Sequence, residues 1–197
     1  DVSGSMYGRP LATSVGLTIY FAERNIGAYH NLFMTFSERP KIVEMKGSDI
    51  FDKINFISRA AWGYSTNFEA AMELVLDIAV KSRCDQEDLP KAVVCVTDME
   101  FNQASRTDRI TYTKHVQRMF AAKGYVAPVL IFWNVNSRND VFHGSENDSG
   151  VILVSGQSPS TFENLIRFMN GEKPMGPVEF MYAVLNSERY AMIRLPE

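Results

Sequence analysis

Hydrophobic residues along the chain follow two patterns, a spacing of three or four residues and short continuous apolar runs. The first pattern is typical of helices that bury one face, and it predicts helices over residues 10–24, 49–57, 68–82, 108–123, 160–170 and 177–185. The second pattern, rich in β-branched and aromatic residues, predicts strands over residues 31–37, 41–45, 92–97, 126–135 and 151–155. Residues 136–150 are polar and rich in turn formers, so we expect a mobile loop there.

Two local details of these helices can be tested against a structure. Ile50, Ile54 and Ile57 share one side of the helix predicted over 49–57. Ser160 and Glu163 have the spacing of a capping box, so we expect Ser160 to open the helix over 160–170.

The alternation of strands and helices predicts an α/β fold, a doubly wound and mostly parallel sheet with helices on both faces. Residues 92–97 form a nearly continuous apolar run, as expected for a strand buried on both faces. At 197 residues and 22.3 kDa the chain fits a single domain over residues 1–197.

Three separated segments supply oxygen-bearing side chains. The chain begins Asp1-Val2-Ser3-Gly4-Ser5, Thr66 lies in a Gly-Tyr-Ser-Thr-Asn segment, and Asp98 ends the strand predicted over 92–97. Oxygen ligands suit a small hard cation such as Mg²⁺. The two negative charges of Asp1 and Asp98 would roughly balance the charge of a divalent ion. The bound ion would still attract an external anion. The pattern favours metal-mediated adhesion or assembly.

The predicted fold brings these segments together, because ligand sites in such sheets lie at the carboxyl ends of strands. Asp98 occupies that position, and Asp1 would too if a strand precedes it. Each residue also has a simpler interpretation. Thr66 with Glu69 matches a capping box, Asp98 could satisfy backbone amides in a turn, and the two serines are common turn formers.

Composition narrows the classes of function. The net charge is −3, from 20 basic and 23 acidic residues, and without a long basic run the chain does not resemble a general nucleic-acid binder. No apolar stretch has the length of a membrane span, and no signal peptide is visible. Cys84 and Cys95 are expected to be reduced thiols, which predicts an intracellular, cytoplasmic protein.

The five residues in this order resemble the metal-ion-dependent adhesion site (MIDAS) of von Willebrand factor A (vWA) domains. The resemblance covers nearly the whole chain and implies a Rossmann-like fold with Mg²⁺ or Mn²⁺ held by Asp1, Ser3, Ser5, Thr66 and Asp98. It also implies a protein partner whose carboxylate completes the metal's coordination shell. In that family a central strand precedes the first loop. We therefore expect this strand to be missing, and the chain to be the C-terminal part of a longer protein.

Within the family, three segments resemble the vWA domain of Ro-type ribonucleoproteins and of a related uncharacterised family: residues 94–101, 129–134 and 154–156. A ribonucleoprotein-type assembly is therefore an expected setting, with RNA binding only through regions that this chain lacks. We expect Glu100, Asn102 and Arg106, just past Asp98, to form the rim that contacts a partner.

Three functions remain in competition. The first is a divalent-cation-dependent protein-interaction module that is not an enzyme. The second is a Mg²⁺-dependent phosphohydrolase using Asp1 and Asp98, although Ser3 stands where a dehalogenase-like enzyme needs a second aspartate. The third is a structural domain with a vestigial metal site.

Overall fold

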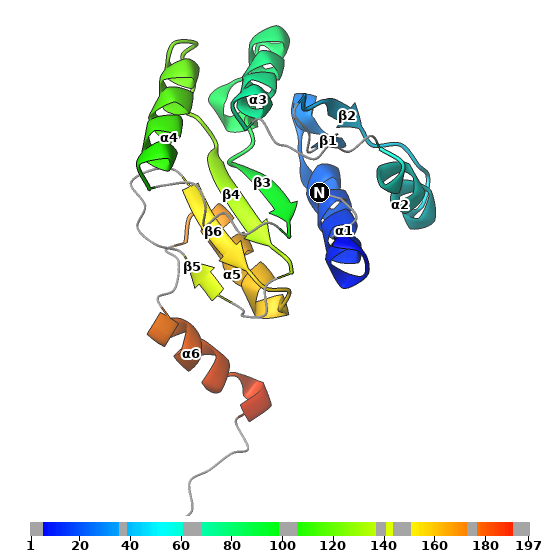
Figure 1. Cartoon of the computed structure of the whole chain (residues 1–197), viewed down its shortest axis with the longest axis vertical. Helices are drawn as coiled ribbons and strands as arrows, with labels where there is room; N and C mark the ends of the chain where they lie inside the picture. The colour runs from blue at the N-terminus through cyan, green and yellow to red at the C-terminus, as the bar shows by residue number, and fades with distance from the viewer. Residues whose placement is uncertain are drawn as a thin grey trace, which may run out of the picture.

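The computed structural model describes residues 6–35, 39–60, 68–98, 106–136, 141–143, 151–172 and 177–190. The elements run along the chain from a long first helix to an isolated last one (Figure 1). In order they are α1 (Arg9–Arg24), β1 (Leu32–Met34), β2 (Ile42–Glu44), α2 (Ile50–Ser58), α3 (Phe68–Ser82), β3 (Ala92–Thr97), α4 (Arg106–Ala121), β4 (Val129–Asn134), β5 (Val141–His143), β6 (Val151–Ser155), α5 (Pro159–Met169) and α6 (Pro177–Leu185).

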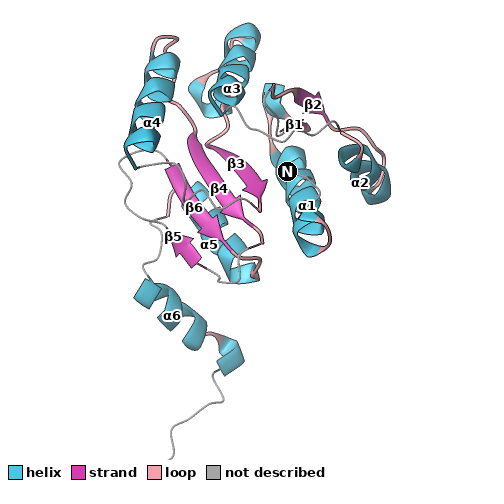
Figure 2. Ribbon diagram, in the orientation of Figure 1, coloured by secondary structure: helices cyan, strands magenta, loops and turns pink. Residues whose placement is uncertain are grey.

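The main sheet has the strand order β3-β4-β6-β5 (Figure 2). β3, β4 and β6 are parallel, and β5 runs antiparallel to β6. The expected mixed α/β fold with a parallel sheet is confirmed. β5 lies inside the segment 136–150, so the expectation of a loop throughout that segment was wrong. Three residues between turn formers are too short to show a strand's alternation.

Helices cover both faces of this sheet. One face carries Val94, Ile131 and Ile152, which are aligned in register and belong to the core formed with α1 and α5. The opposite face carries Val93 and Leu130, with Val93 joining it to the core of α3 and α4. Successive strand residues alternate between the two faces of the sheet. The apolar residues of β3 therefore contribute to the cores on both faces.

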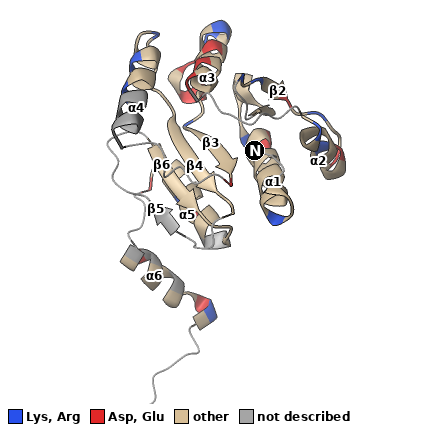
Figure 3. Ribbon diagram, viewed as in Figure 1, with Lys and Arg blue, Asp and Glu red and all other residues tan. Residues whose placement is uncertain are grey.

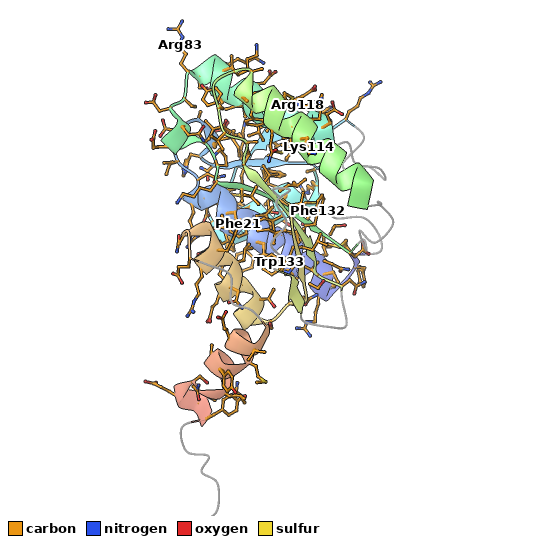
Figure 4. The ribbon with its side chains drawn as sticks, turned by 90° about the vertical axis from the view of Figure 1, so that its left-hand side faces the viewer. Phe21, Arg83, Lys114, Arg118, Phe132 and Trp133 are labelled. Atoms are coloured by element: carbon orange, nitrogen blue, oxygen red, sulfur yellow. The ribbon has the colours of Figure 1, made fainter. Side chains whose placement is uncertain are left out.

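Neighbouring residues of β4 show the two faces clearly. Trp133 is 2% exposed and packs in the same core as Phe21 of α1, whereas Phe132 belongs to the cluster on the other face (Figure 4). β4 begins at Val129 and not at residue 126 as expected. Pro128 precedes it and has no N–H to donate to a neighbouring strand.

β3 is the last strand on its side of the main sheet. The carbonyl oxygens of Lys91 and Thr97 accept hydrogen bonds from the N–H groups of Val129 and Val135. Because backbone groups alternate in direction along a strand, those of Ala92 and Val94 point away from β4. Within the described ranges, Ala92 and Val94 have no backbone partner on that side. None of the described strands pairs with β3 on this side.

β1 and β2 form a separate antiparallel pair that packs with α2 against α1. Ile57 is fully buried there, whereas Ile50 and Ile54 are 51% and 39% exposed. The apolar side of this helix is therefore only partly buried. Only the C-terminal part of α2 turns its apolar side to the core formed by α1 and Phe33.

The start of α5 also differs from its prediction. The cap is Ser158, whose Oγ accepts a hydrogen bond of 3.2 Å from the N–H of Thr161, and Ser160 lies inside the helix. Pro159 occupies the first helical turn, where its fixed φ and missing N–H cost nothing, so the cap falls immediately before it. α6 is a helix as predicted, stands apart from the sheet in Figure 1, and exposes Val178, Met181, Tyr182 and Leu185.

Candidate functional site

Asp98 follows the last residue of β3 and lies at the carboxyl edge of the parallel strands. Thr97, immediately before it, is fully buried and is aligned with Asn134 of β4. Asn134 is in turn aligned with Ser155 of β6. Apolar residues fill the strands, and polar residues begin together at their carboxyl ends. Asp98 is partly exposed, so its carboxylate belongs to a polar edge that solvent can reach.

Three hydrogen bonds join the carboxyl ends of β4 and β6 at this edge of the sheet. The indole N–H of Trp133 donates to the carbonyl oxygen of Gly156 over 2.7 Å. The side-chain amide of Gln157 donates to the carbonyl oxygen of Val135. The N–H of Gly156 donates to the carbonyl oxygen of Asn134 over 2.9 Å. Buried polar groups with partners favour a single arrangement. These bonds therefore hold the segments that follow β4 and β6 in one arrangement.

The remaining predicted site residues cannot be placed beside Asp98. Arg106 is the first residue of α4, and its side chain is outside the described part. The other predicted metal ligands and rim residues lie outside the described ranges: Asp1, Ser3, Ser5, Thr66, Glu100 and Asn102. The convergence of the five metal ligands therefore stays a prediction, of which the position of Asp98 is the part that the structure describes.

Two of the three histidines have nearby partners. His30 Nδ1 lies 2.8 Å from the carbonyl oxygen of Asn25. His115 Nε2 lies 2.8 Å from Glu69 Oε1 and joins α4 to α3 at the surface. Over the residues that the structure describes, His, Cys, Asp and Glu side chains do not gather in groups of three that could hold a metal ion.

Both cysteines are free, and neither environment favours a thiolate. Burial raises the pKa of the Cys95 thiol to about 12. Burial also raises the pKa of Cys84, with a further contribution from the carboxylates of Asp88 and Asp85. Both thiols are therefore protonated at neutral pH, and because the thiolate is the reactive form, neither is suited to nucleophilic chemistry.

Two surface grooves were not predicted from the sequence. One lies between the Arg39–Pro40 turn, α3 and Met119 of α4. The other lies between the β1–β2 pair and α2, and three of its ten lining residues are basic. The first groove joins segments far apart in the chain, whereas the second is built from residues 35–60. A signal for the second was present in the sequence, since Lys41, Lys46 and Arg59 follow one another across 19 residues, but their convergence depends on tertiary packing.

None of the helices in the described ranges is long and apolar enough to cross a membrane.

Comparison with known proteins gives two findings. Residues 1–184 match the sequence profile of a family described as a domain of unknown function (DUF7788). Over 186 residues, or 94% of this chain, the sequence is 33% identical to the uncharacterized protein L728 of Acanthamoeba polyphaga mimivirus. The matched region is 32% of that protein, so the chain spans about a third of the length of this relative.

Proposed function

The chain belongs to the DUF7788 family, and we propose that it is a divalent-cation-dependent module that binds an acidic group of a protein partner. The observation that carries this proposal is the position of Asp98 at the carboxyl end of β3. Ligands of open parallel sheets bind at this edge. A carboxylate there that solvent can reach supplies an oxygen ligand suited to Mg²⁺ or Mn²⁺.

The remaining ligands in this proposal are Asp1, Ser3, Ser5 and Thr66, which the resemblance to vWA domains assigns. Two carboxylates and three hydroxyls would leave the ion with little excess negative charge around it. The bound metal would then attract a carboxylate from a partner. Glu100, Asn102 and Arg106 would form the surrounding rim and select among partners.

The proposal also includes the finer fold. A vWA domain has a further central strand, and the side of β3 away from β4 is where the main sheet could accept one, because none of the described strands pairs with β3 there. Such a strand would be supplied by a longer protein. An intracellular setting within a Ro-type assembly is part of the same proposal, supported by the two free thiols.

Calorimetric titration of the full-length protein with Mg²⁺ and Mn²⁺ tests the metal site. We expect one saturable site that is lost in Asp98→Ala. Asp77→Ala is the matched control, because Asp77 is an exposed carboxylate of α3, paired with Lys81, away from the carboxyl edge of β3. Metal binding that persists in Asp98→Ala, or that is absent from a folded protein, would contradict the proposal and leave a structural domain.

Activity measurements separate the module from an enzyme. The proposal expects no metal-dependent hydrolysis of p-nitrophenyl phosphate by the full-length protein. Hydrolysis that requires Mg²⁺ and disappears in both Asp98→Ala and Asp1→Asn would instead establish a phosphohydrolase. Binding of acidic peptides that rises with Mg²⁺ and is lost in Asp98→Ala would support the interaction module.

A further inference from the structure

The groove between the β1–β2 pair and α2 has an unusual balance of charge. Lys41, Lys46 and Arg59 line it together with one carboxylate, that of Asp52, so its lining carries a net charge of +2. The whole chain carries −3. All three cations are exposed, and none of them forms an ion pair within the described part of the chain. Figure 3 shows a basic position on the segment between β2 and α2, where Lys46 lies.

The one carboxylate in the groove already accepts hydrogen bonds from a neighbouring residue. Asp52 Oδ2 accepts hydrogen bonds from the hydroxyl of Ser48 over 2.9 Å and from its backbone N–H over 3.3 Å. Asp52 therefore closes the turn before α2, and it forms no ion pair with the three cations of the lining in the described part of the chain. The nearby cation that is neutralised, Lys53, lies 2.6 Å from Glu23 and is not part of the lining.

The floor of the groove offers a buried hydroxyl and an aromatic ring. Thr35 is 5% exposed, and its Oγ1 accepts a hydrogen bond of 3.2 Å from the N–H of Lys41. Its hydroxyl proton has no acceptor among the described residues and remains able to donate to a ligand. Half-buried Phe56 supplies an apolar surface beside it.

The backbone at Gly47 sets the width of the groove. Its φ of +138° is in the region that favours glycine, and a Cβ there would lie 2.7 Å from Asp52 Cβ and 2.8 Å from Lys53 N. Only glycine allows the chain to pass this close to α2. The close passage keeps the segment that carries Lys46 beside α2, which Arg59 follows.

We propose that this groove binds a phosphate monoester. At neutral pH such a group carries a charge of about −1.5 to −2 and three acceptor oxygens, which matches the net charge of +2 and the donors of Lys41, Lys46, Arg59 and Thr35. The groove has a volume of about 580 Å³, within the range of small-molecule sites. That volume accommodates an organic group on Phe56 as well as the phosphate.

Titration of the full-length protein with phenyl phosphate tests the proposal. A chelator is present, so that a metal bound near Asp98 cannot capture the anion. We expect saturable binding that weakens as salt is added. Lys46→Ala and Arg59→Ala should each weaken it about tenfold or more, because a charged hydrogen bond is lost. Lys114→Ala and Arg118→Ala are matched controls, since these exposed cations lie on α4 (Figure 4) and should leave the affinity unchanged.

Three results would overturn the proposal. The first is no saturable binding of phenyl phosphate at millimolar concentration. The second is equal affinity in Lys46→Ala, Arg59→Ala and the two controls. The third is benzoate binding as tightly as phenyl phosphate, since the groove would then select any aromatic anion. Asp98→Ala separates this groove from the metal site: binding unchanged in that variant supports the proposal, and binding lost in it would place the anion at the carboxyl edge instead.

Discussion

The indole N–H of Trp133 and the carbonyl oxygen of Gly156 are joined by a buried hydrogen bond of 2.7 Å. This bond connects β4 to the turn that follows β6. It therefore joins the carboxyl ends of β4 and β6, at the same edge of the sheet as Asp98.

Trp133→Phe should destabilise the domain. Phenylalanine keeps an aromatic ring in the core but leaves the Gly156 carbonyl without its donor, and an unsatisfied buried group costs about 1–3 kcal/mol. Urea unfolding of the full-length protein measures the change. Phe162→Leu is the control, since Phe162 stacks with Trp133 and loses packing but no hydrogen bond. Stability in Trp133→Phe equal to that of the unchanged protein would show that the hydrogen bond contributes nothing.

Gly47→Ala and Gly16→Ala should change stability in opposite directions. Alanine at 47 meets the first turn of α2 at 2.7 Å with an unfavourable φ, which costs about 1–3 kcal/mol. Gly16 lies inside α1 with open space around it, so alanine there should stabilise by about 0.5–1 kcal/mol. Thermal unfolding of both variants provides the comparison. A stable Gly47→Ala protein would mean that the turn relaxes without strain.

Stability should fall as the pH rises above about 9, with Cys95 as a main cause. Burial raises the pKa of this thiol from 9.0 to about 12. The folded state therefore keeps the proton that the unfolded state loses, and the stability it contributes is full below pH 9 and lost progressively towards pH 12. Cys95→Ala should flatten the dependence of the unfolding free energy on pH more than Cys84→Ala does. Equal slopes in the two variants would contradict this assignment.

Glu23 should make the contact between α1 and α2 sensitive to acid. The hydrogen bond from Lys53 holds the pKa of this carboxyl below its ordinary value of 4.5. Its contribution to stability is present above pH 4.5 and is lost as the pH falls through the lowered pKa. Glu23→Gln should therefore be less stable than the unchanged protein at neutral pH, and the two should converge in acid. Unfolding curves at several pH values would test this, and a constant difference would refute it.

The parts of the fold that follow from local pattern could be predicted from the sequence. The continuous apolar run of β3 required burial on both faces, and its residues do divide between two cores. The helix predicted over residues 10–24 likewise corresponds to α1, which buries Val15, Ile19 and Ala22. Such features depend on period and composition, which a single sequence contains.

Features that depend on tertiary contacts were missed or misplaced. β5 forms because Phe142 is aligned with Val154 of an already buried strand, and three residues alone carry no such signal. At the candidate site, the sequence placed Asp98 correctly at a strand end. The basic groove was not foreseen because Lys41 and Arg59 come together only when the β1–β2 pair and α2 pack into a shared core.

The pairing of β4 also governs how the domain folds. Both of its neighbours, β3 and β6, lie parallel to it, and parallel strands cannot be joined by a tight turn. Ala92 can meet Val129 only after the chain through α4 has folded back across the sheet. Formation of the central ladders therefore waits for long loops to close, which places folding on the order of milliseconds to seconds. The polar carboxyl edge depends on the pairing of these strands. We therefore expect it to form only after the parallel ladders have closed.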